Sequence, residues 1–213
     1  MRNHLILILA LIAGTSFYFN HWIVLDGTGM IVWKGLGVGL LAVWAGTEAR
    51  STDGWLIAAV MALSALGDVM LETNGLTIGA IPFLVGHVVS IILYLRNRRS
   101  PVWVALAIAV AVSALAFSLP IDRSAAPGIA LYAFGLGAMT GTAFTSRFPR
   151  IVWIGAAMFV VSDMLIFTRL SPIGQTEIAD LLIWPLYFAG EALVAWGVVT
   201  AVEKRDEDLH HRL

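Results

Sequence analysis

Five ionisable side chains interrupt the long apolar stretches of this sequence and could carry chemistry: Lys34, Asp68, His87, Asp163 and Glu191. An ionisable group inside a bilayer costs roughly 2.5–3.5 kcal/mol on insertion scales, so it normally faces a bundle interior or a wet cavity. Asp and Glu have stems too short to reach water from inside a span, which favours a functional site over simple bridging between helices. Snorkelling explains Lys34 alone equally well, and a structural role explains His87 alone.

The spacing of neighbouring polar residues places several of them on shared helix faces. Ser64 and Asp68 are four residues apart, as are Tyr187 and Glu191, and residues four apart lie on one face of a helix. Two sheltered carboxyl groups can hold one proton between them, which gives a general acid and a general base in one site. Such a pair suits a reaction that protonates a substrate and activates water.

The elements that must position these residues are membrane-spanning helices. The chain has 213 residues, of which 59% are hydrophobic and 13% charged, and its mean hydropathy is +0.87. A span takes about 20 residues, and eight apolar stretches are visible: Leu5–Phe19, Ile31–Gly46, Trp55–Leu71, Gly79–Leu95, Val102–Leu119, Ala125–Phe144, Ile151–Phe167 and Leu181–Val202. No alternating strand pattern appears. The sequence therefore predicts an all-α polytopic membrane protein with eight transmembrane helices, one integral membrane domain at 1–202 and a charged cytoplasmic tail at 203–213.

The distribution of basic residues predicts the orientation of this bundle. The chain has 13 lysines and arginines, and only Arg123 and Arg169 lie in odd-numbered connections. Under the positive-inside rule, both termini of this multi-pass protein of the cell membrane face the cytoplasm. Counted at about 1.5 Å per residue, the five ionisable residues lie in the outer half of the membrane or at its midplane. The sequence therefore predicts one shared polar pocket that opens away from the cytoplasm.

The two ends of the chain allow other interpretations. Residues 5–19 follow Arg2 and have small residues near their end, as a signal peptide does, but we take them as the first span. His210 and His211 lie in a tail of mixed charge, where a solvated end is expected rather than a metal site.

Several function classes are excluded or disfavoured. The net charge of −1 offers no basic surface to nucleic acid, and the absence of cysteine excludes thiolate chemistry and Cys-ligated metals. The sequence contains no G-x-S-x-G, H-E-x-x-H or Walker motif. His87 could join the three acidic residues around a metal, but one histidine without a spaced partner makes this a minority interpretation. We therefore predict no metal and no cofactor, and the oligomeric state stays open.

A faint internal repeat relates the two halves. The segment Ser64–Asp68 (SALGD) is similar to Val160–Asp163 (VVSD), and each is followed by a helix that carries an aromatic residue, a glycine and an ionisable residue. These residues are Phe83, Gly86 and His87 in one half and Tyr187, Gly190 and Glu191 in the other. The pattern predicts two parallel four-helix repeats, with Asp68 and Asp163 in equivalent positions.

Four of the spans carry short segments that point to a family. SALGDVML (64–71), GAIPFLVGHVV (79–89), GAAMFVVSDMLI (155–166) and WPLYFAGEALVA (184–195) resemble, in this order and spacing, the YhhN-like lysoplasmalogenase family. Lys34 stands where that family carries a lysine early in the second span. Gly35 then replaces an expected proline, and Glu191 replaces an expected glutamine.

The resemblance implies an eight-span membrane enzyme that hydrolyses the vinyl-ether bond of lysoplasmalogens, a class of lysophospholipid, to a fatty aldehyde and a glycerophospho-alcohol. Asp68 and Asp163 match the expected catalytic pair, and which is acid and which is base stays open. Lys34 would hold the phosphate as a point charge. The residues expected to orient substrate or water are Ser64, His87, Tyr187 and Glu191.

Two other functions stay open at this point. Intramembrane acidic residues and parallel repeats are equally typical of a proton-coupled transporter. Polar residues that stop at the midplane argue against a carrier, which needs access from both sides. A non-catalytic lipid-binding membrane protein is the third possibility.

Overall fold

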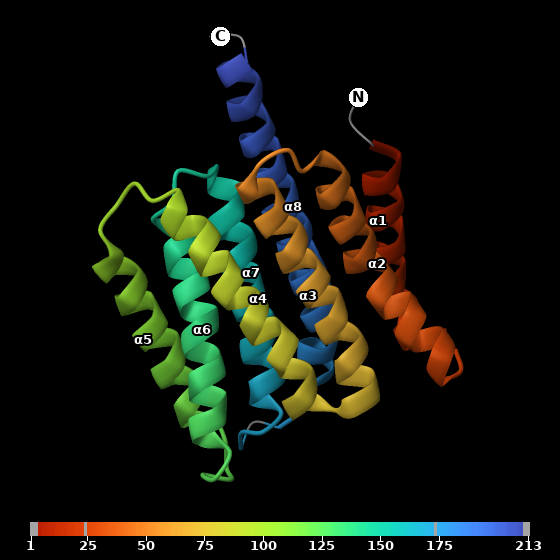
Figure 1. Ribbon diagram of the computed structural model, residues 1–213. Helices are drawn as coiled ribbons and strands as arrows, with labels where there is room; N and C mark the ends of the chain where they lie inside the picture. Colours follow the sequence, from red (N-terminus) through yellow and green to blue (C-terminus); the bar gives the residue numbers. More distant parts are fainter. Residues whose placement is uncertain (1–3, 24, 173, 211–213) are drawn as a thin grey trace.

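The computed structural model describes residues 4–23, 25–172 and 174–210, and its eight α-helices run up and down between the two ends of one bundle (Figure 1). The helices are α1 (His4–Ser16), α2 (Gly27–Glu48), α3 (Thr52–Asn74), α4 (Leu76–Arg96), α5 (Val102–Ser118), α6 (Ala126–Phe144), α7 (Arg150–Thr168) and α8 (Glu177–His210). A 3-10 turn, η1 (Phe17–His21), continues α1, and no β-strand is found in the described ranges. The predicted all-α bundle of eight helices is confirmed.

Most of these helices are long and apolar enough to cross a bilayer. In the described part of the chain, six qualify by length and composition: α1 with η1, α2, α3, α4, α7 and α8. Helix α5 is apolar but has only 17 residues, whereas α6 has 19, as α7 does, and falls short in hydropathy rather than in length. Large apolar side chains such as Trp55, Trp103 and Leu131 are exposed on the bundle surface, as expected where a protein faces lipid. The chain is a polytopic helical membrane protein.

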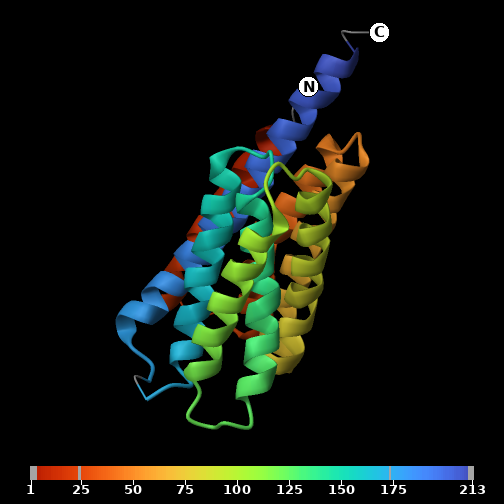
Figure 2. The same ribbon diagram turned by 90° about the vertical axis from the view of Figure 1, so that its left-hand side faces the viewer.

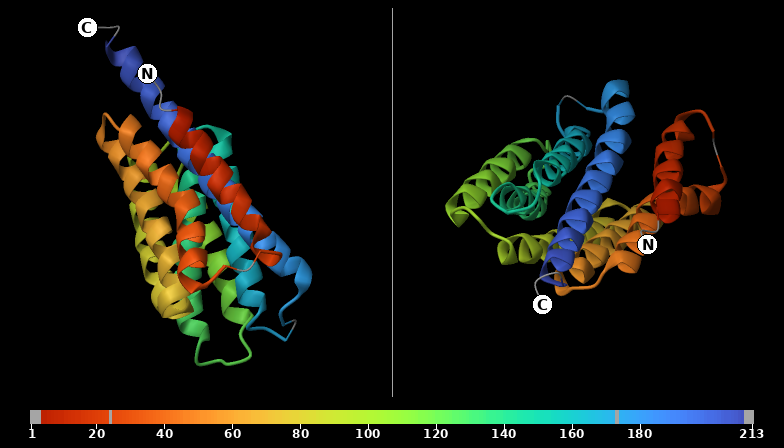
Figure 3. Two further views of the ribbon diagram at one scale, coloured as in Figure 1. Left: turned by 90° about the vertical axis from the view of Figure 1, so that its right-hand side faces the viewer. Right: turned by 90° about the horizontal axis from the view of Figure 1, so that it is seen from above.

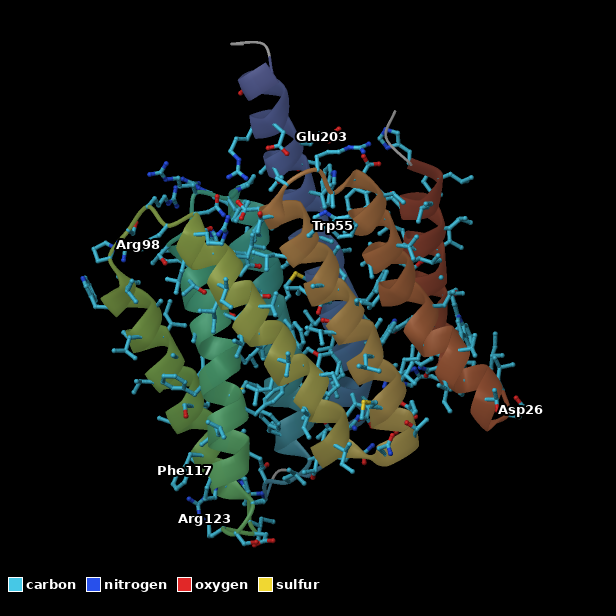
Figure 4. All side chains as sticks on the ribbon, viewed as in Figure 1. Asp26, Trp55, Arg98, Phe117, Arg123 and Glu203 are labelled. Carbon is cyan, nitrogen blue, oxygen red and sulfur yellow. The ribbon has the colours of Figure 1, made fainter. Side chains whose placement is uncertain are left out.

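Helix α1 begins and helix α8 ends at the same end of the bundle, which we call the inner end; the opposite end is the outer end (Figure 1). Figure 4 shows Arg98 and Glu203 at the inner end, and Asp26 and Arg123 at the outer end. The connections rich in arginine therefore lie on the side of both termini. By the positive-inside rule, we expect that side to face the cytoplasm.

The region predicted as a charged tail at 203–213 begins as a continuation of α8, which runs as one helix to His210 and projects from the inner end (Figure 2). Its glutamate, lysine and arginine residues are good helix formers, so the helix does not end where the apolar stretch does. Arg205 Nη2 donates to the buried carboxylate of Asp53 at 2.8 Å, and Arg96 Nε donates to the same carboxylate at 2.9 Å. This cluster fixes the inner end of α8 to α3 and α4. The sequence predictions also used residues that lie outside the described ranges, namely Arg2, His211 and Arg212. The side chain of His210 is likewise not described.

Helix α8 lies at the centre of the packing, in contact with α1, α2, α3 and α7. Seen from above, it separates α5, α6 and α7 from α1 and α2 (Figure 3). Helix α4 packs on α6 and α8 packs on α2, as the predicted repeat requires. However, α3 also packs on α8 backbone to backbone, whereas α7 meets α4 through the Phe159 ring, which contacts the rings of Phe83 and His87. The two halves share part of their packing order, and the repeat itself stays a prediction.

Glycines allow the closest approach between α7 and α8. A Cβ atom added to Gly155 would lie 2.6 Å from the Gly190 carbonyl oxygen, and one added to Gly190 would lie 2.7 Å from the Gly155 oxygen. The two backbones are therefore in contact at this crossing. Further along α7, the Ser162 hydroxyl donates to the Ile183 carbonyl of α8 at 2.9 Å. Together these contacts set the position of Asp163, the residue after Ser162, relative to α8.

Candidate functional site

A cavity of about 550 Å³ lies in the outer half of the bundle, among α2, α3, α4, α6, α7 and α8. Its volume is in the range of small-molecule sites. Lys34, Asp68 and Asp163 are its charged lining residues among those described, and most of the remaining wall is apolar or aromatic. The aromatic lining residues are Phe83, Tyr132, Phe159, Phe167, Trp184 and Tyr187. The lining extends to Thr77 and Ser124 near the outer connections, so the cavity reaches the outer end.

Two hydrogen bonds, one helical turn apart, connect α3 and α8. The Tyr187 hydroxyl donates to Asp68 Oδ2 at 2.8 Å, and the Ser64 hydroxyl donates to Glu191 Oε1 at 2.8 Å. Because the two helices are antiparallel, the earlier residue on α3, Ser64, meets the later residue on α8, Glu191. All four side chains are buried. Asp68 and Tyr187 line the cavity, whereas Ser64 and Glu191 lie behind its wall, one turn closer to the inner end.

Asp163 has a different partner, which the sequence interpretation missed. The Tyr132 hydroxyl, from α6, donates to Asp163 Oδ2 at 2.8 Å. His87 Nε2 lies 3.4 Å from the same hydroxyl oxygen, a long but compatible hydrogen-bond distance. Because the Tyr132 hydroxyl donates its hydrogen bond to Asp163, its oxygen can accept one from His87 when Nε2 carries the hydrogen. His87 is buried and acts on the cavity only through Tyr132, which lines it.

Lys34 lines the cavity and is already paired in this structure. Its Nζ atom lies 2.6 Å from Glu72 Oε1, and the side chains are 15% and 44% exposed, respectively. Glu72 is four residues after Asp68 on α3, so the two acidic residues share a helix face. The pair therefore places Lys34 at the Asp68 side of the cavity. An anionic ligand group would have to replace or join Glu72 at the ammonium.

The structure thus brings Lys34, Asp68, Asp163 and Tyr187 to one cavity. Ser64, His87 and Glu191 stand in a second layer that holds these residues in place. Within the described residues no hydrogen bond joins the two aspartates directly, and each carboxylate accepts a hydrogen bond from its own tyrosine. A phenol in the middle of an apolar span was the available signal for Tyr132, since a buried hydroxyl requires a partner.

The same region can be examined for metal binding. Among the residues that the structure describes, no three His, Cys, Asp or Glu side chains are close enough to hold a metal ion. His87 faces Tyr132 and Glu191 faces Ser64, so their donor atoms already have neutral partners.

The Ser64–Glu191 hydrogen bond gives a prediction about stability. Glu191→Gln keeps an oxygen that can accept the Ser64 hydroxyl, so we expect little change in the free energy of unfolding. Glu191→Leu leaves that buried hydroxyl without its partner and should cost about 1–3 kcal/mol. Thermal unfolding of the two variants in detergent, followed by intrinsic fluorescence, measures the difference. Equal losses in both variants would contradict this assignment of the bond.

Comparison with known proteins identifies a family for the chain. The family model described as the YhhN family matches residues 29–198, a span that contains every described lining residue of the cavity. No curated protein and no solved structure shows significant similarity to the chain. Because the match covers most of the sequence, the chain belongs to the YhhN family.

Proposed function

We propose that this protein is an intramembrane hydrolase that cleaves the vinyl-ether bond of lysoplasmalogens to a fatty aldehyde and a glycerophospho-alcohol. The observation that carries the proposal is that Asp68 and Asp163, from separate helices, line one cavity together with Lys34. The family resemblance supplies the substrate class, and the chemistry of an enol ether fits the residues independently.

An enol ether is hydrolysed by proton transfer to the carbon remote from oxygen, followed by attack of water on the resulting oxocarbenium ion. The reaction requires one protonated carboxyl group and one carboxylate at the same site, as in glycoside hydrolysis. The two tyrosines fix the orientation of the aspartates by donating to one oxygen of each. The other carboxylate oxygen of each aspartate is left to face substrate or water.

The cavity also fits the shape of a lysophospholipid. The aromatic and aliphatic wall suits the single hydrocarbon chain. Lys34 would hold the phosphate as a point charge near the outer end. Glu72, its present partner, is 44% exposed, so this carboxylate can stay hydrated when a phosphate takes its place at the ammonium.

The first experiment measures aldehyde release. Detergent-purified protein is incubated with lysoplasmenyl-ethanolamine and, in parallel, with the matched alkyl-ether lysolipid, which cannot be protonated to an oxocarbenium ion. We expect free aldehyde from the vinyl ether alone. Absence of aldehyde from both lipids would reject the proposed hydrolase.

The same preparation distinguishes the two alternatives. A proton-coupled transporter would move a lysolipid or another solute into sealed proteoliposomes in response to a pH gradient and release no aldehyde. A non-catalytic lipid-binding protein would do neither. The cavity reaches the outer end, and no observation among the described residues favours a second entrance over a one-sided site.

A further inference from the structure

The two aspartates that line the cavity have unlike electrostatic surroundings. On the Asp68 side, Glu72 lies one helical turn along α3, and Lys34 is held against it. Glu72 is the more exposed partner, so water screens its charge more strongly than that of Lys34. Of these two charges, the one on Lys34 is therefore the less screened, and Lys34 lines the cavity together with Asp68. The Tyr187 hydroxyl adds a hydrogen bond to the same carboxylate.

At hydrogen-bond distance Asp163, like Asp68, has one neutral partner among the described residues. Its partner is the Tyr132 hydroxyl, which is backed by His87 and by the edge-on ring of Phe167. In the described residues, helix α2, which carries Lys34, packs against α3, which carries Asp68, and not against α7, which carries Asp163. The remaining acidic groups, Asp68 and Glu191, can only oppose a second negative charge there.

From this asymmetry we propose that Asp163 is the general acid and Asp68 the general base, with Lys34 and the Tyr132–His87 pair as positioning residues. The inference rests on the proposed hydrolase function and assigns the roles within it. Like charges close together in a sheltered site do not both ionise readily, so one proton stays on the pair. The cation beside Asp68 decides which of the two is the carboxylate.

The assignment gives a cycle in which protons balance. Asp163 transfers its proton to the vinyl carbon remote from oxygen, and the double-bond electrons form the new C–H bond, leaving an oxocarbenium ion. Water attacks the carbon bound to oxygen while Asp68 takes its proton, which gives a hemiacetal. Asp163, now ionised, removes the hemiacetal hydroxyl proton as Asp68 returns its own proton to the ether oxygen. The C–O bond breaks, aldehyde and alcohol are released, and both aspartates regain their starting states.

The test is chemical rescue of alanine variants. In Asp68→Ala, formate added at neutral pH can take the place of the missing carboxylate, and we expect it to raise the rate of aldehyde release about tenfold or more. In Asp163→Ala, formate supplies no proton at that pH, and we expect no rescue. Rescue of Asp163→Ala alone, or of both variants equally, would overturn the assignment.

A second measurement decides the question if neither variant responds to formate. Lys34→Met removes the cation beside Asp68, so a higher pH is required to ionise that carboxyl group. The acidic limb of the pH–rate profile should then move to higher pH while the basic limb stays in place. Arg169→Met removes a cation that pairs with Asp180 at the outer end, away from the cavity lining, and should leave both limbs unchanged. A shift of the basic limb in Lys34→Met, or no shift, would overturn the assignment.

The outcome separates this inference from the function on which it rests. If the unaltered protein releases no aldehyde, the proposed hydrolase fails. If the unaltered protein is active and the variants behave in the reverse order, the hydrolase stands and only the roles are exchanged.

Discussion

Replacing Asp68 or Asp163 with asparagine is expected to lower the turnover number for vinyl-ether hydrolysis by about 10²–10⁴-fold each. Asparagine keeps the size of the side chain and an oxygen that can accept the tyrosine hydroxyl, so the cavity should stay intact. It cannot exchange a proton, so the step that each aspartate serves is lost. The measurement is aldehyde release under saturating lysoplasmenyl-ethanolamine, with KM determined separately.

A variant with both aspartates replaced by asparagine tests whether Asp68 and Asp163 act together. Because the two carboxyl groups act as a unit, losing both should lower turnover hardly more than losing one. Independent effects that multiply would show that the aspartates do not work in the same steps. Retention of turnover in either single variant would reject the site.

A matched control is available at the outer end. Hydrogen bonds from the hydroxyl and backbone N–H of Ser124 lower the pKa of Asp122, so this exposed carboxylate stays ionised at neutral pH. Asp122 is not itself a lining residue, and asparagine keeps an oxygen that can accept the backbone N–H of Ser124, which does line the cavity. Asp122→Asn therefore removes one negative charge from the same side of the protein. We expect its turnover to match that of the unaltered protein.

Gly155→Ala is expected to destabilise the protein by about 1–3 kcal/mol, because the added methyl group overlaps the α8 backbone. The clash is with the Gly190 carbonyl oxygen at 2.6 Å, and a backbone cannot rotate away as a side chain can. Separation of α7 from α8 should also disturb the cavity, since Asp163 and Tyr187 stand on these two helices. Thermal unfolding and aldehyde release, measured on the same detergent preparation, should both fall.

Gly46 provides the same substitution at a site without neighbours. A Cβ atom added there meets nothing within 4 Å, although the residue is also helical. Gly46→Ala should leave stability unchanged or raise it by up to about 1 kcal/mol, the difference in helix propensity between the two residues. If both alanine variants unfold alike, the close crossing of α7 and α8 is not what holds the site.

Hydropathy alone predicted the eight helices, because a span must be long, apolar and closed in its backbone hydrogen bonds. It marked the end of the last apolar stretch at Val202, and α8 runs on to His210, because charged residues end an apolar stretch without ending a helix. The projecting turns are held by Arg205 and Asp53, residues 152 positions apart in sequence. No local pattern contains a contact of that range.

The site was also predictable only in part, because local spacing is visible in the sequence and tertiary packing is not. Spacing by four showed that Ser64 and Asp68, and likewise Tyr187 and Glu191, share helix faces. It could not show that these two faces meet, because the relative rotation and register of α3 and α8 depend on tertiary packing. Tyr132 was missed because a single phenol in an apolar stretch has no partner until α6 is placed beside α7.

The length and anchoring of α8 have a consequence for how the protein fits bilayers of different thickness. This helix is tied at its inner end by Asp53 and nearer its outer end by Trp184, whose indole N–H donates to the Gly14 carbonyl at 2.7 Å. Helices adjust to hydrophobic mismatch by tilting, at a modest cost for each ångström. Because α8 is held at both ends, it cannot tilt independently of its neighbours. Edge helices such as α5 must therefore make the adjustment to the bilayer thickness. The depth of Tyr187 relative to Asp68 should therefore stay constant when the surrounding lipid is changed.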